Sequence, residues 1–272
     1  MAGADSVEAR ARAIRAKIVR MAHAGRTPHV ASALSCADLV AALYFNVLRI
    51  DPAAPQDEAR DRFILSKGHG CMALYAVLAE RGFFAEGLLG EYARDGGRLA
   101  EHPAPHCVPG VEAATGSLGH GLPLGAGLAL AAKIRQSSYR VFVLLSDGEC
   151  AEGSVWEAAL FARAQRLDNL VAVVDYNKFS AMGPTSPYLE PLAEKWRAFG
   201  WSCVEIDGHR VDSIAAALSR LPFEPRQPFV VIAHTVKGKG VSFMENDLEW
   251  HYRPPNDNDL RRALDEIEGR LP

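Results

Sequence analysis

Two short apolar runs separated by one helical segment most constrain the fold of this chain. Residues 141–146 (VFVLLS) and 170–175 (LVAVVD) are rich in Val and Leu, as expected of strands that are buried on both faces of a parallel sheet. The intervening segment, EGSVWEAALFARAQRLD, is predicted to form a helix. Such a unit delivers both following loops to the same carboxyl edge of the sheet, where open α/β folds bind ligands. We therefore expect an α/β fold with a mostly parallel central sheet.

Polar residues at the ends of these runs predict a divalent-metal site. Asp147 directly follows the first run and Asn177 follows the second, so the two side chains are expected to meet. A carboxylate, an amide oxygen and a backbone carbonyl suit a hard cation such as magnesium and leave positions for phosphate oxygens. Gly148 has no side chain where the backbone would approach that phosphate. An Asp-Gly pair alone is an ordinary turn signal, so the prediction depends on the whole pattern from Asp147 to Asn177.

Composition excludes several classes of protein. The 272 residues are 49% hydrophobic and carry a net charge of −3, with a pI near 6.3, which predicts no basic surface for nucleic acid. The five cysteines are odd in number and contain no C-x-x-C pair, which indicates a reducing cytoplasm. Neither a signal peptide nor an apolar run of membrane-spanning length is recognised. We expect a soluble, cytoplasmic protein without a membrane partner.

The chain shows no internal repeat or low-complexity linker, so residues 1–272 are expected to form one domain. The opening helix is expected to end near Ala24, and Ser35 is expected to cap a second helix. Residues 83–109 are predicted to be irregular, and the tail 237–255 is predicted to be an ordered loop. Further strands are predicted at 201–207 and 228–236, and further helices at 193–199 and 211–221.

Eight motifs match one known family over nearly the whole chain. In order they are HVASALS, FILSKGHG, EHPAPH, TGSLGHG, SDGECAEGSVWEA, VVDYNK, DGH and TVKGKGVSFMENDLEWH. The chain resembles the amino-terminal half of transketolase, as found in split transketolases made of two chains. The resemblance implies the thiamine diphosphate-binding fold, with helices on both faces of the sheet, and thiamine diphosphate as the cofactor.

The resemblance also implies roles for individual residues. The metal is expected to be Mg²⁺, with Ca²⁺ or Mn²⁺ as substitutes, held by Asp147, Asn177 and the carbonyl of Phe179. Contacts to the cofactor are expected from Ser32, Lys67, His69, Gly116, Leu118, Gly148, Glu149, Asn177, Lys237 and His251. The residues expected to face the substrate channel and to act in catalysis are His29, His69, His102 and His251.

The implied chemistry explains why four histidines gather. Thiamine catalysis cleaves a carbon–carbon bond of a ketose and passes a two-carbon unit to an acceptor, so hydroxyl and carbonyl oxygens exchange protons at each step. Imidazole titrates near neutrality and suits this exchange. His209 stands in a DGH turn typical of the family, but we expect it to be mainly structural.

Family transketolases also carry a pyrimidine-binding domain that supplies an activating glutamate. No sequence for that domain precedes the end of the chain at Pro272, so we expect it on a separately encoded C-terminal subunit. The expected assembly is α2β2, with active sites between unlike chains and Glu152 at the subunit interface. Sugar phosphates are the expected substrates, and the missing half is expected to hold their phosphate.

Four positions depart from the family pattern. Pro28 replaces a glycine before His29, and proline restricts the backbone of its neighbour. His120 and Ala181 each stand where glutamine is common, and Tyr252 follows His251 where glycine is usual. These changes favour a specialised acceptor.

Two alternatives remain open. In the first, the chain is the alpha-type subunit of another thiamine diphosphate enzyme, such as a 2-oxo acid dehydrogenase or a deoxyxylulose phosphate synthase. In the second, it is a non-catalytic scaffold subunit. The enzymes of the first alternative share the metal motif but lack the SKGHG, EHP and TVKGKGVSFME set. The intact pattern of Asp147, Asn177, Lys237 and His251 argues against the second.

Overall fold

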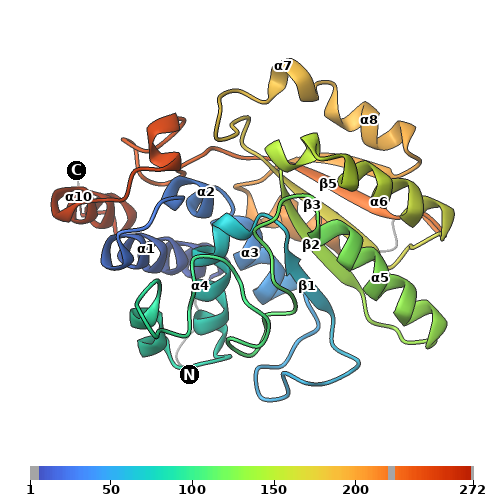
Figure 1. Cartoon of the computed structure of the whole chain (residues 1–272), viewed down its shortest axis with the longest axis horizontal. Helices are drawn as coiled ribbons and strands as arrows, with labels where there is room; N and C mark the ends of the chain where they lie inside the picture. Colours follow the sequence, from blue (N-terminus) through green and yellow to red (C-terminus); the bar gives the residue numbers. More distant parts are fainter. Residues whose placement is uncertain (1–5, 220–223, 271–272) are drawn as a thin grey trace.

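Five parallel strands form one sheet at the centre of the computed structural model, which describes residues 6–219 and 224–270 (Figure 1). Their order across the sheet is β1-β2-β3-β5-β4, and every neighbouring pair is parallel. The strands are β1 (Arg62–Leu65), β2 (Val141–Ser146), β3 (Leu170–Tyr176), β4 (Ser202–Asp207) and β5 (Phe229–His234). The predicted α/β class with a mostly parallel sheet is confirmed, and the two runs that predicted it are the adjacent strands β2 and β3.

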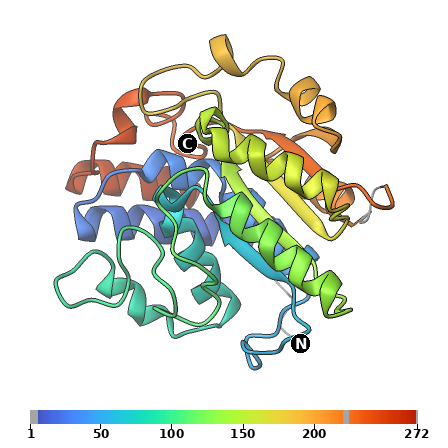
Figure 2. The same cartoon turned by 45° about the vertical axis from the view of Figure 1, so that its right-hand side comes forward.

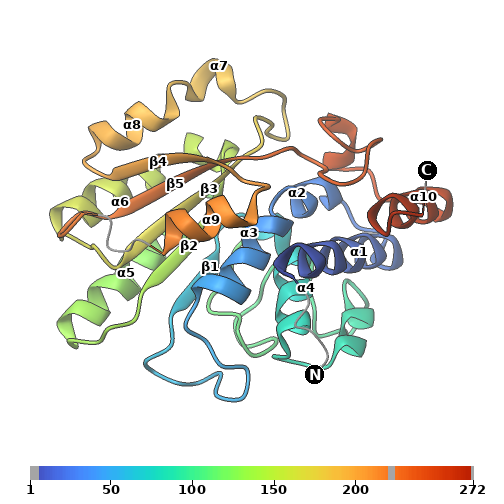
Figure 3. The same cartoon turned by 180° about the vertical axis from the view of Figure 1, so that it is seen from behind.

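Helices cover both faces of this sheet. On one face, α1 (Val7–Gly25), α2 (Val30–Ser35), α3 (Ala37–Ala42), α4 (Cys71–Arg81) and α9 (Val211–Leu218) share one buried core with the strands, and α10 (Asp257–Ile267) packs against α1. The other face packs against α5 (Gly121–Ile134), α6 (Gly153–Ala164) and α8 (Leu192–Ala198), with the short α7 (Ser186–Leu189) beside them. Figure 2 shows α5 and α6 along one side of the sheet and α1 and α10 side by side, and Figure 3 shows α3 and α9 on the opposite face.

Alternation along the central strands explains why both faces are covered. In β2, Phe142 and Leu144 belong to the core under α1 and α4, whereas Val143 and Leu145 belong to the core under α5 and α6. All residues of β2 and β3 are buried. A strand with apolar side chains on both faces must be sandwiched between helices.

The segment after α1 differs from the single helix that was predicted. It contains two short helices, α2 and α3, which meet at Cys36, and a π-helical turn (Leu43–Val47) follows them. The predicted helix cap at Ser35 was wrong: its hydroxyl donates to Oδ2 of Asp175 at 2.5 Å and also lies 3.0 Å from the carbonyl of Ser32. The hydroxyl of Ser35 is therefore engaged with a buried carboxylate and caps no helix.

The helix α10 follows the tail loop and was not predicted. It begins with a capping box, in which the Asn256 side chain accepts from the N–H of Asp259 and the Asp259 side chain accepts from the N–H of Asn256. Among the described residues, none of the helices has the length and apolar character needed to cross a membrane.

Candidate active site

A cavity of about 570 Å³ lies at the carboxyl edge of the sheet, where β1, β2 and β3 end. It contains most of the residues that the sequence singled out. Those that line it are His29, Ser32, His69, His102, Gly116, Leu118, Gly148, Asn177, Phe179 and His251. Asp147, Lys67, Glu149 and Lys237 do not line it but are buried, each with no exposed surface. The structure therefore brings all the predicted site residues to one place, in two layers.

Asp147 is fixed at the end of β2 by the loop that follows β3. Its Oδ2 accepts from the backbone N–H of Lys178 at 2.7 Å and from the hydroxyl of Thr185 at 2.9 Å, and its Oδ1 accepts from the N–H of Gly148 at 2.8 Å. These bonds use three of the roughly four acceptor positions of a carboxylate. One acceptor position on Oδ1 is therefore left for a cation.

Asn177 lies beside Asp147 at the end of β3 and is 4% exposed. Its Oδ1 accepts from the N–H of Phe179 at 3.1 Å, which folds the chain back after the strand and leaves one lone pair of the amide oxygen. Among the described residues, no three His, Cys, Asp or Glu side chains group as a metal site. A cation here would need amide and carbonyl oxygens together with oxygens from its ligand.

The charge around Asp147 fits such a cation. Burial, together with the nearby charge of Asp175, raises the pKa of Asp147 to about 6. Within the described part of the chain, no basic side chain forms an ion pair with it. A buried carboxylate without a counter-ion is stabilised by a divalent cation, so the residues present fit Mg²⁺ with a diphosphate.

Lys237 and His251 form a buried pair on another side of the cavity. Their Nζ and Nδ1 atoms are 2.9 Å apart, and Lys237 has no exposed surface. Burial and the charge of Lys67 lower the pKa of Lys237 to about 8. In the region that the structure covers, its ammonium has no carboxylate within ion-pair distance. A buried cation with this surrounding suits an anionic ligand.

Three imidazoles cluster where α2 meets the tail. The ring centroid of His29 lies 5.3 Å from that of His69 and 4.9 Å from that of His251. Burial first, and then neighbouring positive groups, lower the pKa of His29 to about 4, that of His251 to about 3 and that of His69 well below its usual value. All three rings are therefore neutral at pH 7. Nδ1 of His29 is buried and has no partner among the described atoms, so it remains free for a ligand.

Lys67 faces away from the cavity and into a buried ion pair that the sequence did not reveal. Its Nζ lies 2.5 Å from Oδ2 of Asp175 and 2.8 Å from the carbonyl of Ser32. Although burial alone would lower it, the charge of Asp175 holds the pKa of Lys67 above its usual value. Asp175 also accepts from Ser35 and Thr235. The sequence did contain one indication of this ion pair: Asp175 stands at the end of an apolar, buried run, and a buried charge must be paired.

Glu149 supports a neighbouring loop from below the cavity. Its Oε1 accepts from the N–H of Gly119 at 2.8 Å and from the hydroxyl of Ser66, and its Oε2 accepts from the N–H of Ser146 at 3.2 Å. The loop that it holds contains Gly116, where an added Cβ would lie 2.6 Å from the ring of His102. This close approach, with φ of +136°, explains why glycine occupies that position.

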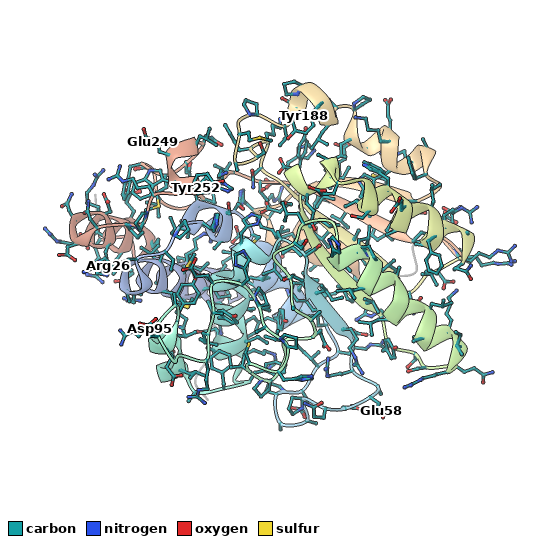
Figure 4. The ribbon with its side chains drawn as sticks, in the orientation of Figure 1. Arg26, Glu58, Asp95, Tyr188, Glu249 and Tyr252 are labelled. Atoms are coloured by element: carbon teal, nitrogen blue, oxygen red, sulfur yellow. The ribbon has the colours of Figure 1, made fainter. Side chains whose placement is uncertain are left out.

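The mouth of the cavity carries exposed side chains. Tyr252 is 63% exposed and lies near α2, and Tyr188 belongs to α7 (Figure 4). Both line the cavity, as do Ala181 and Glu152. His120, by contrast, is exposed outside the cavity, where its Nδ1 lies 3.0 Å from the carbonyl of Leu118. Of the four departures from the family pattern, Ala181 and Tyr252 therefore shape the cavity directly.

His29, which follows Pro28, occupies the left-handed region with φ of 70°. Its backbone N–H donates to the carbonyl of His251 at 2.9 Å. This bond ties the start of α2 to the tail and fixes the ring over the cavity. The departure at Pro28 therefore coincides with a constrained backbone at His29.

Comparisons with known proteins extend this picture. A family model described as transketolase, thiamine diphosphate binding domain, matches residues 6–267. The chain is 37% identical over 269 residues to one subunit of the apulose-4-phosphate transketolase of Phocaeicola vulgatus, covering 98% of this chain and 95% of the relative. It is 42% identical over 242 residues to one subunit of the 6-deoxy-6-sulfo-D-fructose transketolase of a Clostridium species, covering 88% of each chain.

Solved structures show the same relationship in three dimensions. Transketolase from Leishmania mexicana superimposes with a TM-score of 0.90 at 27% identity over 98% of this chain, which spans 42% of that protein. The family model and these relatives each account for nearly all of the chain. The chain therefore belongs to the transketolase family of transferases and carries its thiamine diphosphate binding domain.

Proposed function

We propose that the chain binds thiamine diphosphate together with Mg²⁺, for which Ca²⁺ or Mn²⁺ substitute, and acts in the transfer of a two-carbon ketol unit from a ketose to an acceptor. The observation that carries this proposal is that two buried groups of opposite charge, neither with an ion-pair partner among the described residues, lie at different sides of one cavity. Asp147 lies without a counter-ion at one side and Lys237 at another. A metal diphosphate supplies both missing partners at once.

In this proposal, Asp147, Asn177 and the carbonyl of Phe179 hold the metal. Lys237 and His251 bind the diphosphate, and Gly116, Leu118 and Gly148 line the remainder of the cofactor. When bound, thiamine diphosphate supplies the nucleophilic carbon at which a ketose is cleaved. Two layers of buried side chains keep these groups rigid, which favours binding in one orientation.

The histidines supply proton transfer around the reacting carbon. His29, His69 and His251 are neutral at pH 7, so in this proposal they accept hydrogen bonds from substrate hydroxyls, although their lowered pKa values make them weaker bases than an ordinary imidazole. His102 is exposed on the facing loop and lines the same cavity, where it reaches the substrate rather than the diphosphate. In this proposal His251 therefore acts toward both the diphosphate and the substrate, whereas His102 acts toward the substrate alone.

A partner chain is part of the proposal. Relatives that match this chain over most of their length are themselves named as single subunits of a transketolase. We infer that a C-terminal transketolase subunit supplies the pyrimidine-binding domain in an α2β2 assembly, and that residues 1–272 form the single diphosphate-binding domain. Glu152 is exposed at the cavity mouth, where the partner would meet it. The five free cysteines favour a cytoplasmic location.

Sugar phosphates are the proposed substrates. The named relatives concern apulose 4-phosphate and 6-deoxy-6-sulfo-D-fructose, which both carry an anionic group. Among the described residues that line the cavity there is no Lys or Arg. The partner chain would therefore bind the anionic end of the substrate, while Ala181 and Tyr252 shape the space for the acceptor.

The test is to purify this chain alone and together with the product of the partner gene, and to screen ketose phosphates against aldehyde acceptors. We expect ketol transfer only from the complex, with a requirement for Mg²⁺ and thiamine diphosphate. Robust ketose cleavage by the chain alone would refute the shared active site. Decarboxylation of pyruvate without activity on ketose phosphates would favour a 2-oxo acid enzyme, and failure to bind the cofactor would favour a scaffold role.

A further inference from the structure

The backbone around Lys237 is held by three polar side chains from distant parts of the chain. We call these residues the clamp: Arg15 of α1, Asp38 of α3 and His209 of the turn between β4 and α9. None of them lines the cavity. Figure 3 shows α3 and α9 on the same face of the sheet, which explains how the turn before α9 reaches Asp38.

Asp38 is the centre of the clamp. Its two oxygens accept from Nη1 and Nη2 of Arg15 at 3.0 and 2.5 Å, and its Oδ2 also lies 2.8 Å from Nδ1 of His209. The side chains of Arg15 and Asp38 are each 9% exposed and that of His209 is 15% exposed. A bidentate pair in a buried setting fixes geometry as well as charge.

The clamp holds the backbone on both sides of Lys237. Before it, the N–H of Val236 donates to Nε2 of His209 at 2.8 Å. After it, the carbonyl of Lys239 accepts from Nε of Arg15 at 3.0 Å. The two flanking peptide groups are thus bound to two side chains that share one carboxylate, which leaves Lys237 little freedom to move.

Hydrogen-bond chemistry fixes the state of the His209 ring. A backbone N–H can only donate, so Nε2 must be the unprotonated nitrogen and Nδ1 must carry the hydrogen that it donates to Asp38. Asp38 therefore selects the one neutral tautomer that can hold Val236. The backbone N–H of His209, which donates to Asp207 at 2.9 Å, further restrains the turn.

We propose that His209 is a positioning residue for Lys237: bound to Asp38, it holds Val236 and so directs the buried ammonium of Lys237 at an anionic diphosphate. The role of the ammonium rests on the proposed function, whereas the restraint of the segment does not. Lys237 has no carboxylate partner in the described part of the chain, so its direction depends on its backbone and on His251.

The first experiment measures the restraint on the full chain without any ligand. His209→Leu removes both hydrogen bonds of the ring, and His209→Gln keeps an acceptor at the reach of Nε2. Amide hydrogen exchange in a peptide covering 235–246 should become at least about tenfold faster in His209→Leu and return toward the wild-type rate in His209→Gln. His23→Leu is the matched control, because it removes a His–Asp contact of 2.7 Å between α1 and Asp257 that does not involve this segment.

The second experiment measures the consequence with inorganic pyrophosphate in the presence of Mg²⁺, by calorimetry on the same variants. His209→Leu should weaken binding by about tenfold, the effect expected when a charged ligand group loses its orientation. His209→Gln should recover most of that loss, and His23→Leu should bind as the wild type does.

The outcomes separate the two hypotheses. Unchanged hydrogen exchange in His209→Leu would overturn the proposal that His209 restrains the segment. If the wild type binds pyrophosphate, an unchanged affinity in His209→Leu would overturn the proposal that His209 positions Lys237. Wild-type protein that fails to bind pyrophosphate would instead count against the proposed function. In that case the exchange rates alone decide whether His209 positions the segment.

Discussion

At the scale of single residues, the candidate site consists of polar groups whose partners come from other parts of the chain. Asp147 receives its hydrogen bonds from residues 178 and 185, and Asp175 is bound to Lys67 from the end of β1. Each of these carboxylates is fully buried. Removing one therefore affects both a proposed ligand and the loops that it holds.

Asp147→Ala should abolish binding of thiamine diphosphate in the presence of Mg²⁺, because it removes the only charged ligand proposed for the metal. It also leaves the N–H of Lys178 and the hydroxyl of Thr185 without a partner. The free energy of unfolding should then fall by about 1–3 kcal/mol. Calorimetry measures the first effect and urea unfolding the second. Asp147→Asn, which keeps one acceptor oxygen, serves as the control. Unchanged cofactor affinity in Asp147→Ala would refute the proposal that Asp147 is a metal ligand.

His102→Ala should lower the turnover of the assembled enzyme by about 100-fold while cofactor affinity changes little, since general acid–base groups contribute effects of about this size. The ring lies against Gly116 on the loop side of the cavity, and within the described part of the chain it makes no hydrogen bond or ring contact with Lys237 or His251 in the proposed cofactor site. Steady-state kinetics at saturating cofactor measures turnover, and titration of the cofactor measures affinity. An equal loss in both would contradict a role toward substrate.

The motif residues around Asp147 and Asn177 could be identified from the sequence because their spacing is local. Asp175 and Thr185 could not, since their importance depends on which side chains fold against them. Asp175 ends a run of apolar residues and its sequence neighbours give no indication of Lys67, which lies in the turn after β1. Partners of buried charges are determined by strand order.

At the scale of elements, helix ends and strand ends were harder to predict than the elements themselves. β2 and β3 follow directly from their apolar runs. The break between α2 and α3 cannot be predicted in this way, because no Gly or Pro marks it, and the bond from Ser35 to Asp175 beside it joins distant parts of the chain. The helix α10 carried a signal in the capping box at Asn256 and Asp259 that was overlooked.

The link between the loop before β1 and the start of β2 offers a stability test away from the site. Asp61 is 1% exposed and accepts from the backbone N–H groups of Arg49 and Arg140, each at 2.9 Å, and from both guanidinium groups. Asp61→Ala should lower the free energy of unfolding by about 3 kcal/mol, measured by urea unfolding. Glu91→Ala, which breaks an exposed pair with Arg98, should leave the transition nearly unchanged. Equal effects would contradict this ranking.

The contact between α2 and the tail predicts a pH dependence of stability. The pKa of His251 is about 3 in the folded chain and that of His29 about 4, both below the ordinary value of 6.5. Between pH 6.5 and 4 the unfolded chain binds these protons and the folded chain does not, so stability falls as the pH falls. His251→Asn should therefore show a smaller loss over this range than the wild type.

Urea unfolding of both proteins at pH 7, 6, 5 and 4 measures this difference. Comparing slopes cancels contributions from groups that both proteins share, including Asp147, whose raised pKa acts in the opposite direction. Identical slopes would contradict a neutral, buried His251.

At the scale of the whole molecule, the neighbouring helices α5 and α6 expose four large apolar side chains. Leu124 and Ile134 on α5 are 46% and 74% exposed, and Leu160 and Phe161 on α6 are 58% and 42% exposed. Large apolar side chains exposed on neighbouring helices are a candidate interaction surface. These side chains support the proposed assembly with further chains. The motifs in the sequence could not indicate where on the molecule such a contact surface lies.

Leu160→Glu should reduce the mass of the assembly formed with the partner chain, because it places a charge in an apolar contact. Sedimentation equilibrium measures the mass, and circular dichroism checks the fold. Arg12→Glu, at an exposed position of α1, is the control and should leave the mass unchanged. A full-sized assembly from Leu160→Glu would exclude this surface as the interface.

The hydrogen bond from the N–H of His29 to the carbonyl of His251 joins two parts of the chain that are made at very different times. During synthesis, β1, β2 and β3 and the helices between them can pack before the tail has left the ribosome. The histidine cluster and the pair of Lys237 and His251 cannot form at that stage, because they include residues of the tail. The proposed diphosphate site would therefore be completed only after residues 237–251 have left the ribosome, when the strands β1, β2 and β3 have already been made.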